Sequence, residues 1–220
     1  LFLYTDEQAF NTLAAYGNTQ IEMPNLNRLA ACSTVFDEAY VTQPVCTPSR
    51  STLMTGLWPH TNGCIANNEP LPAVVPCLPE MLPEGAYHSG HYGKWHLGDE
   101  IFCQHGFDDW RSIEDMYARF YSPGRDRSAR SDYHHYLVSL GYRPDKKNNI
   151  FSRNFTARLP EEHGKPAWLA GEACEFLRQH RHEPFALCVN ILEPHMPYFS
   201  PRDDQYDPDA VESRVFEYWD

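Results

Sequence analysis

The sequence of 220 residues lacks several features that would place it at once in a large class of proteins. It has no internal repeat, no low-complexity stretch and no apolar run long enough to cross a bilayer. None of its seven cysteines forms a Cys-x-x-Cys pair, which weakens a zinc-site interpretation. Positive charge is also scarce, because 18 Lys and Arg residues stand against 30 Asp and Glu residues. We therefore expect no membrane span and no nucleic-acid partner, since phosphate contacts need clustered Lys and Arg.

The composition that is present suits a folded domain. Hydrophobic residues make up 42% of the chain, charged residues 22% and aromatic residues 14%, which argues against disorder and allows a sizeable core. The net charge of −12 repels small anions at long range. An anionic substrate would therefore need positive groups within its own pocket.

The two ends of the sequence carry no mark of a complete chain. The apolar residues Leu1 to Tyr4 are typical of a buried strand already under way, and not of a signal peptide with a basic start. There is no initiator Met, and the chain stops at Asp220 without a clear domain end. We expect truncation at both ends of a single domain over residues 1–220, with any export signal cut away.

The alternation of short apolar runs with amphipathic runs is typical of α/β folds. Strands are predicted at residues 1–5, 35–41 and 185–192, and the last is a near-continuous apolar run typical of a central strand. Helices are predicted at residues 24–32, 48–55, 76–83 and 167–180. Residues 85–98 are rich in glycine and histidine and indicate a loop or a strand edge. Residues 120–165 are polar and are interpreted as a long surface excursion that faces the substrate.

Asp6 and Glu7 follow the first predicted strand. Adjacent side chains point to opposite faces of an ideal strand, so they can meet at one cation only if the strand ends and turns there. Carboxylates in this arrangement suit Ca²⁺ or Mg²⁺. A solvated acidic turn is the alternative, and spacing alone favours it.

Cys46 lies in the run Cys46-Thr47-Pro48-Ser49-Arg50, where a helix is predicted to begin. Helix N-termini favour anions and activate thiols, and a cation four residues later returns by one turn towards the first position. Cys46 and Arg50 therefore predict a nucleophile beside a cationic clamp. A buried structural cysteine with a surface arginine is the alternative. The odd number of cysteines leaves at least one thiol unpaired, for which Cys46 is our candidate, and the pairing of any disulfides stays open.

Two later segments carry further polar groups. In Gly93-Lys94-Trp95-His96, positions 94 and 96 would point the same way if the segment is extended. His195 follows the strand predicted at 185–192, at the strand end where ligands bind in open α/β sheets. A basic loop and a structural histidine at a strand end are the alternatives.

These segments together resemble the sulfatase family. Cys46-Thr47-Pro48-Ser49-Arg50, with the stretch on to Thr55-Gly56, is similar to the family's signature. Tyr87-His88-Ser89-Gly90 with Gly93-Lys94-Trp95-His96 is similar to its second motif, although Ala86 and Ser89 depart from the usual Gly and Thr. The segment around His195 completes the resemblance, which runs from Leu1 to about Pro201 in the family's order.

The resemblance implies an alkaline-phosphatase-like fold, in which a large mixed sheet lies between helices, and a sulfuric ester hydrolase. Cys46 would be oxidised to formylglycine by a formylglycine-generating enzyme, and its hydrated aldehyde would attack sulfur. The other hydroxyl would then expel sulfate, a step that a serine sulfate ester could not make. Asp6, Glu7 and the residue made from Cys46 would hold Ca²⁺, with Mg²⁺ as the alternative.

The same resemblance assigns the remaining site residues. Arg50 and Lys94 would bind the sulfate oxygens, His96 would contact the nucleophile's hydroxyl, and His195 would lie near the leaving oxygen. The substrate would be a sulfated small molecule or glycan, and the family favours a periplasmic or secreted location. Because further metal ligands and a lysine would come from later sequence, we expect the 220-residue chain alone to bind metal weakly and to be inactive. Phosphonate or phosphodiester hydrolysis and a non-catalytic binding role are the alternatives.

Overall fold

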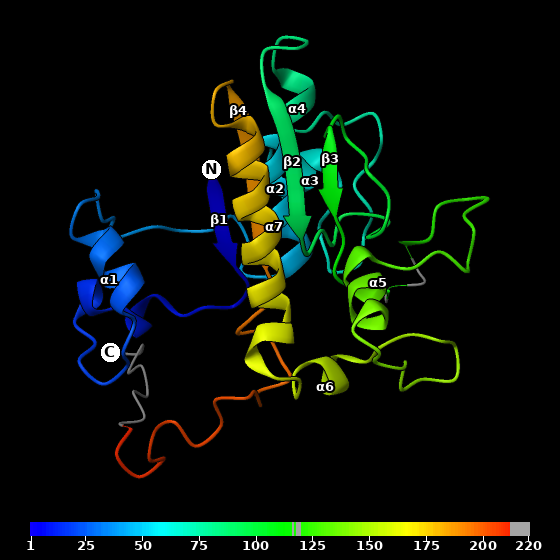
Figure 1. The fold of residues 1–220 in the computed structure, drawn as a ribbon. Helices are drawn as coiled ribbons and strands as arrows, with labels where there is room; N and C mark the ends of the chain where they lie inside the picture. Colours follow the sequence, from blue (N-terminus) through cyan, green and yellow to red (C-terminus); the bar gives the residue numbers. More distant parts are fainter. Residues whose placement is uncertain (116, 118–119, 212–220) are drawn as a thin grey trace.

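A four-stranded sheet forms the centre of the protein in the computed structural model, which describes residues 1–115, 117 and 120–211 (Figure 1). The strands are β1 (Phe2–Thr5), β2 (His88–Gly93), β3 (Asp109–Arg111) and β4 (Phe185–Ile191). They lie in the order β1-β4-β2-β3, and each described pairing is parallel. The strands therefore bring their carboxyl ends to one edge of the sheet, where α/β proteins bind their ligands.

Helices cover both faces of this sheet. Helix α7 (Lys165–His180) lies in front of it in Figure 1, and helices α2 (Cys46–Thr55) and α3 (Pro59–Asn62) lie behind. Alternation along β4 separates the two layers, because Leu187 packs in the cluster that contains Phe176 of α7, whereas Cys188 packs with Met54 of α2. The predicted α/β class with a sheet between helices is confirmed.

Several predicted helices are confirmed with changed bounds. The helix predicted at 48–55 begins two residues earlier, at Cys46, and Gly56 ends it in the left-handed region with φ of 70°. The helices predicted at 24–32 and 76–83 are shorter than expected. The remaining helices are α1 (Pro24–Ala30), α4 (Leu78–Met81), α5 (Asp132–Ser139) and α6 (Arg153–Thr156), with 3₁₀ turns at Phe10–Thr12, Ala14–Tyr16 and Glu161–His163.

The prediction of a loop or strand edge at 85–98 is wrong for residues 88–93, which form β2, an interior strand between β4 and β3, whereas the flanking residues are outside helices and strands. The glycines of β2 serve close packing. A Cβ on Gly90 would come within 2.9 Å of a Leu187 methyl carbon, and one on Gly93 would come within 2.0 Å of the Asn190 carbonyl oxygen. Glycine in this segment therefore marks close contact with β4 and not a flexible loop.

The prediction of a strand at residues 35–41 is also wrong. These residues have no regular structure, and Phe36 and Tyr40 are exposed. β-propensity alone does not form a strand without a neighbouring strand to pair with, and within the described residues this segment has none. The strand at 1–5 exists, but its side chains Leu1 and Leu3 are exposed and not buried, because β1 is the edge strand of the described sheet.

Residues 120–165 lie only partly on the surface. Tyr133 and Leu137 of α5, together with Phe151 and Leu159, are buried in the core cluster beneath α7. A substrate-facing role for this segment stays a prediction. All seven cysteines are free thiols, and no described helix is both long and apolar enough to cross a membrane.

Candidate active site

The carboxyl edge of the sheet gathers most of the predicted site residues. Asp6 directly continues β1, where its N–H donates to the Ile191 carbonyl at 3.1 Å. Lys94 continues β2 in the same way, since its N–H donates to the Asn190 carbonyl at 3.0 Å. The fold thus places an acid and a base from distant parts of the chain at one edge.

Asp6 is the centre of a buried ion cluster. Its Oδ1 lies 3.0 Å from Nη2 of Arg50, and its Oδ2 forms an ion pair with Nζ of Lys94. Burial alone would raise the pKa of the Asp6 carboxyl, but the charges of Arg50 and Lys94 outweigh it and hold that pKa below its usual value. One carboxylate therefore fixes two cations beside the end of the sheet.

Arg50 points into the protein from α2. Its Nη1 donates to the Lys94 carbonyl at 2.8 Å and to Oδ1 of Asn190 at 3.2 Å. Among the contacts of the described residues, none joins Arg50 directly to Cys46. The predicted direct clamp is therefore not seen, and Arg50 reaches the nucleophile position through Asp6 and Lys94.

Cys46 is the first residue of α2 and is half-buried. Nζ of Lys94 lies 3.7 Å from its Sγ, so the ammonium group faces the predicted nucleophile. The next residue, Thr47, is anchored by its N–H to Oδ1 of Asn67 at 3.0 Å. Asn67, which lies 20 residues after Thr47 in the sequence, thus helps to fix the start of α2.

His96 is held in the left-handed region, with φ of 59°. Its N–H donates to Glu100, its carbonyl accepts from Thr47 Oγ1 at 3.1 Å, and its Nε2 lies 3.0 Å from Oδ1 of Asn68. Burial, reinforced by the charges of Lys94 and Arg50, lowers the pKa of His96 to about 3, so its ring is neutral. The predicted contact with the nucleophile's hydroxyl stays a prediction.

Glu100 supports this segment, and no sequence motif indicated it. Its carboxylate accepts the N–H groups of Trp95 at 3.0 Å and His96 at 2.7 Å, and burial raises its pKa from 4.5 to about 7. A folded-state pKa above the unfolded value means that the folded protein binds more protons between these two values. Stability from this group is complete below pH 4.5 and is lost as the pH rises through about 7.

We expect the free energy of unfolding to fall by about 3 kcal/mol across that window because of Glu100. Urea unfolding of the wild-type chain and of Glu100→Gln at a series of pH values measures this. The glutamine variant should lose that part of the pH dependence, although its amide nitrogen cannot accept and one of the two hydrogen bonds is therefore lost. If the free energy of unfolding changed equally with pH in the two proteins, Glu100 would have to stay ionised throughout this pH range.

His195 lies opposite Cys46, at the end of β4. Its Nε2 is 3.3 Å from Oε1 of Glu7, and its Nδ1 lies 2.9 Å from the Met196 carbonyl and 3.4 Å from Nη1 of Arg153. Sequence reasoning missed Arg153, because it lies 42 residues from His195 in a polar segment without a motif. The two ring nitrogens thus face different partners.

The two carboxylates converge as the metal hypothesis requires. Glu7 has φ of 64°, so the chain turns where β1 ends. Asp6, Glu7, Cys46 and His195 each offer one atom within 4.8 Å of the others. The carboxylates suit a hard cation, and an oxygen at position 46 would suit it better than sulfur does. These residues therefore fit a divalent cation shared by Asp6, Glu7 and a modified Cys46.

Comparison with known proteins gives a consistent result. A family model described as Sulfatase matches residues 1–214. The chain is 30% identical over 218 residues to the N-acetylgalactosamine-6-sulfatase of Homo sapiens, which covers 91% of this chain and 40% of that protein. It is 26% identical over 182 residues to the N-acetylglucosamine-6-O-sulfatase of Bacteroides thetaiotaomicron, which covers 76% of this chain and 31% of that protein. The chain thus spans less than half the length of these relatives.

Solved structures of other proteins have a similar fold. The phosphonate monoester hydrolase of Agrobacterium radiobacter superposes with a TM-score of 0.70 at 20% sequence identity, over 96% of this chain and 44% of that one. At this identity the likeness concerns the fold alone. It confirms the predicted alkaline-phosphatase-like arrangement, in which the sheet lies between helices.

Proposed function

Because the chain belongs to the sulfatase family, we propose that its parent protein hydrolyses sulfate esters with a nucleophile made from Cys46. One observation carries the proposal. Lys94 Nζ lies 3.7 Å from Cys46 Sγ, at the same sheet edge where the carboxylates of Asp6 and Glu7 converge. A nucleophile, a cation and a pair of metal-binding acids at one edge suit attack on an anionic ester.

Each residue then has a distinct task. Lys94 supplies positive charge where sulfate would approach Cys46, and Arg50 holds Asp6 in place. His195 directs Nε2 towards the Glu7 side of the site, where a proton can reach the leaving oxygen. Asp6 and Glu7 would hold Ca²⁺ or Mg²⁺, which when bound neutralises charge on the sulfate group.

Formylglycine at position 46 would supply the hydrated aldehyde that attacks sulfur and later releases sulfate. The proposed maturation partner is a formylglycine-generating enzyme that reads Cys46, Pro48 and Arg50. Pro48 and Arg50 are buried in the folded chain. Their burial favours modification before the chain folds around α2.

The substrate class follows from the relatives, two of which are named for sulfated amino sugars. We propose a sulfated carbohydrate as substrate, with aryl sulfates as simpler analogues. Phosphonate monoester or phosphodiester hydrolysis would use the same nucleophile, and a non-catalytic role would use none. The chain alone is expected to be inactive, because it spans less than half of its relatives.

The test uses the full-length parent protein, expressed with and without a formylglycine-generating enzyme. We expect mass spectrometry to find formylglycine in the Cys46 peptide only with that enzyme. Sugar-sulfate hydrolysis should rise in proportion to the modified fraction and exceed phosphonate monoester hydrolysis. Full activity with an unmodified thiol would refute the nucleophile assignment, and faster phosphonate hydrolysis would favour the alternative reaction.

A further inference from the structure

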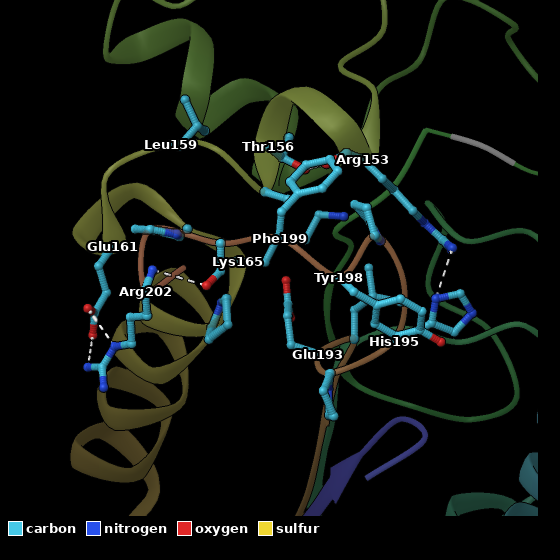
Figure 2. Close-up of a pocket in the computed structure, with 18 of the residues that line it drawn as sticks. Arg153, Thr156, Leu159, Glu161, Lys165, Glu193, His195, Tyr198, Phe199 and Arg202 are labelled. Carbon is cyan, nitrogen blue, oxygen red and sulfur yellow. Dashed lines mark hydrogen bonds and ion pairs between the residues drawn. The ribbon is translucent and has the colours of Figure 1, made fainter. Parts of the chain in front are cut away.

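A cavity of about 610 Å³ lies beside His195 (Figure 2). Helix α6, the start of α7 and the segment after β4 form its walls, and both His195 and Arg153 line it. His195 faces Arg153 with Nδ1 and Glu7 with Nε2. The imidazole ring therefore stands between this cavity and the acidic residue next to the proposed nucleophile.

Arg153 is a fixed cation on the cavity wall. Its Nε and Nη2 each donate to the Glu114 carboxylate at 2.6 Å, and Nη2 also donates to the Tyr117 hydroxyl. Nη1 faces His195, as Figure 2 shows. A guanidinium has five N–H groups, and these contacts use at most four of them within the described residues. At least one N–H of Nη1 therefore has no partner among the described residues, on a side chain that is 15% exposed.

Arg153 shares its carboxylate partner with a second cation. Glu114 is shared between Arg153 and Lys165, whose Nζ lies 3.0 Å from Oε1, so two cations share one carboxylate. Arg202 at the far wall is already paired with Glu161. Glu193 and Asp203 also line the cavity, and the buried Oε2 of Glu193 has no hydrogen-bond partner among the described residues.

Most of the other lining residues are apolar. Tyr198 and Phe199 both line the cavity. Tyr198 is 76% exposed, whereas one face of the Phe199 ring is covered by the Arg158 guanidinium, 3.7 Å from the ring centroid. The C–H faces of a sugar ring can pack against such rings, while sugar hydroxyls reach polar groups at the edges. A cavity of about 610 Å³ falls within the range of small-molecule binding sites.

We propose that this cavity binds the alcohol part of the sulfate ester, and that Arg153 selects sugars that carry a second anionic group on the ring next to the sulfated one. The inference rests on the proposed function and adds the substrate class to it. The sulfate that is cleaved would lie near Lys94, on the Nε2 side of His195. Arg153 lies on the Nδ1 side, so it meets a different anion. That anion is a carboxylate or a second sulfate.

The test compares three sulfated disaccharides as substrates of the full-length parent protein. They differ only in the neighbouring ring, which carries a neutral hydroxymethyl group, a carboxylate or a second sulfate. We expect kcat/KM for an anionic member to exceed that for the neutral one by about tenfold or more. Arg153→Met should abolish this ratio, and Arg153→Lys should restore part of it. Arg178→Met is the matched control, since Arg178 is an exposed arginine paired with Glu175.

A second variant and a second measurement guard against misfolding. Tyr198→Ala alters an exposed wall of the cavity and should raise KM for all three substrates. Calorimetry with the unsulfated anionic disaccharide measures binding without turnover, and Arg153→Met should weaken it about tenfold or more. Equal losses on all substrates in Arg153→Met, or no preference in the wild-type protein, would overturn the inference. Arg153-dependent binding without any sulfate release would instead refute the proposed function.

Discussion

The parent protein with Cys46→Ala should lose about 10⁴-fold or more in kcat for sulfate ester hydrolysis. Cys46 is the nucleophilic side chain at the sheet edge where Lys94 and the carboxylates of Asp6 and Glu7 meet. Without it, only positioning and charge would remain to accelerate attack by water. Steady-state assays with an aryl sulfate measure the loss, and unfolding curves show whether the variant folds.

Two further variants separate chemistry from structure. Cys46→Ser keeps a nucleophilic hydroxyl but not the second hydroxyl that expels sulfate, so we expect a single turnover and an enzyme that retains one sulfate group. Cys32→Ala removes an exposed thiol and should retain full activity. Activity of Cys46→Ala within tenfold of the wild type would mean that another group attacks the ester.

The positions that sequence analysis predicted correctly depend on local signals. Cys46 could be placed at a helix start because Pro48 suits a first turn and Gly56 suits a helix end. The ends of two apolar runs in the sequence predict the turn at Glu7 and the strand end before His195. Such signals depend only on neighbouring residues, so they survive without knowledge of the tertiary structure.

The contacts that sequence analysis missed are long-range. Asn68 reaches His96 from 28 residues away, and Arg153 reaches His195 from 42. Nothing local marks either residue, because their meaning comes from the strand order that brings separate segments to one edge. The same reason explains β2, where Gly90 reads as a turn signal until Leu187 is known to lie against it.

Asp6→Ala should be the most destabilising change in the site. It would leave Arg50 and Lys94, whose side chains are 2% and 0% exposed, as buried cations without their carboxylate. Breaking one partner of a buried ion pair costs about 3–5 kcal/mol, far more than the pair itself contributes. We expect a loss of that order in the free energy of urea unfolding. Because the pKa of Asp6 is lowered, its contribution is present above the unfolded value of 3.8 and is lost as the pH falls below it.

Glu7→Ala provides the matched control, since it removes the neighbouring carboxylate from the same turn. The Glu7 side chain is 42% exposed, and its ion pair is with His195, so its loss should cost less than about 1 kcal/mol. Both variants should weaken Ca²⁺ binding by the parent protein, measured by calorimetry, because both remove a proposed ligand. Equal stability losses in the two variants would refute the role of Asp6 as the structural anchor. Unchanged Ca²⁺ affinity in both would refute the metal assignment and leave the ion cluster as a purely structural feature.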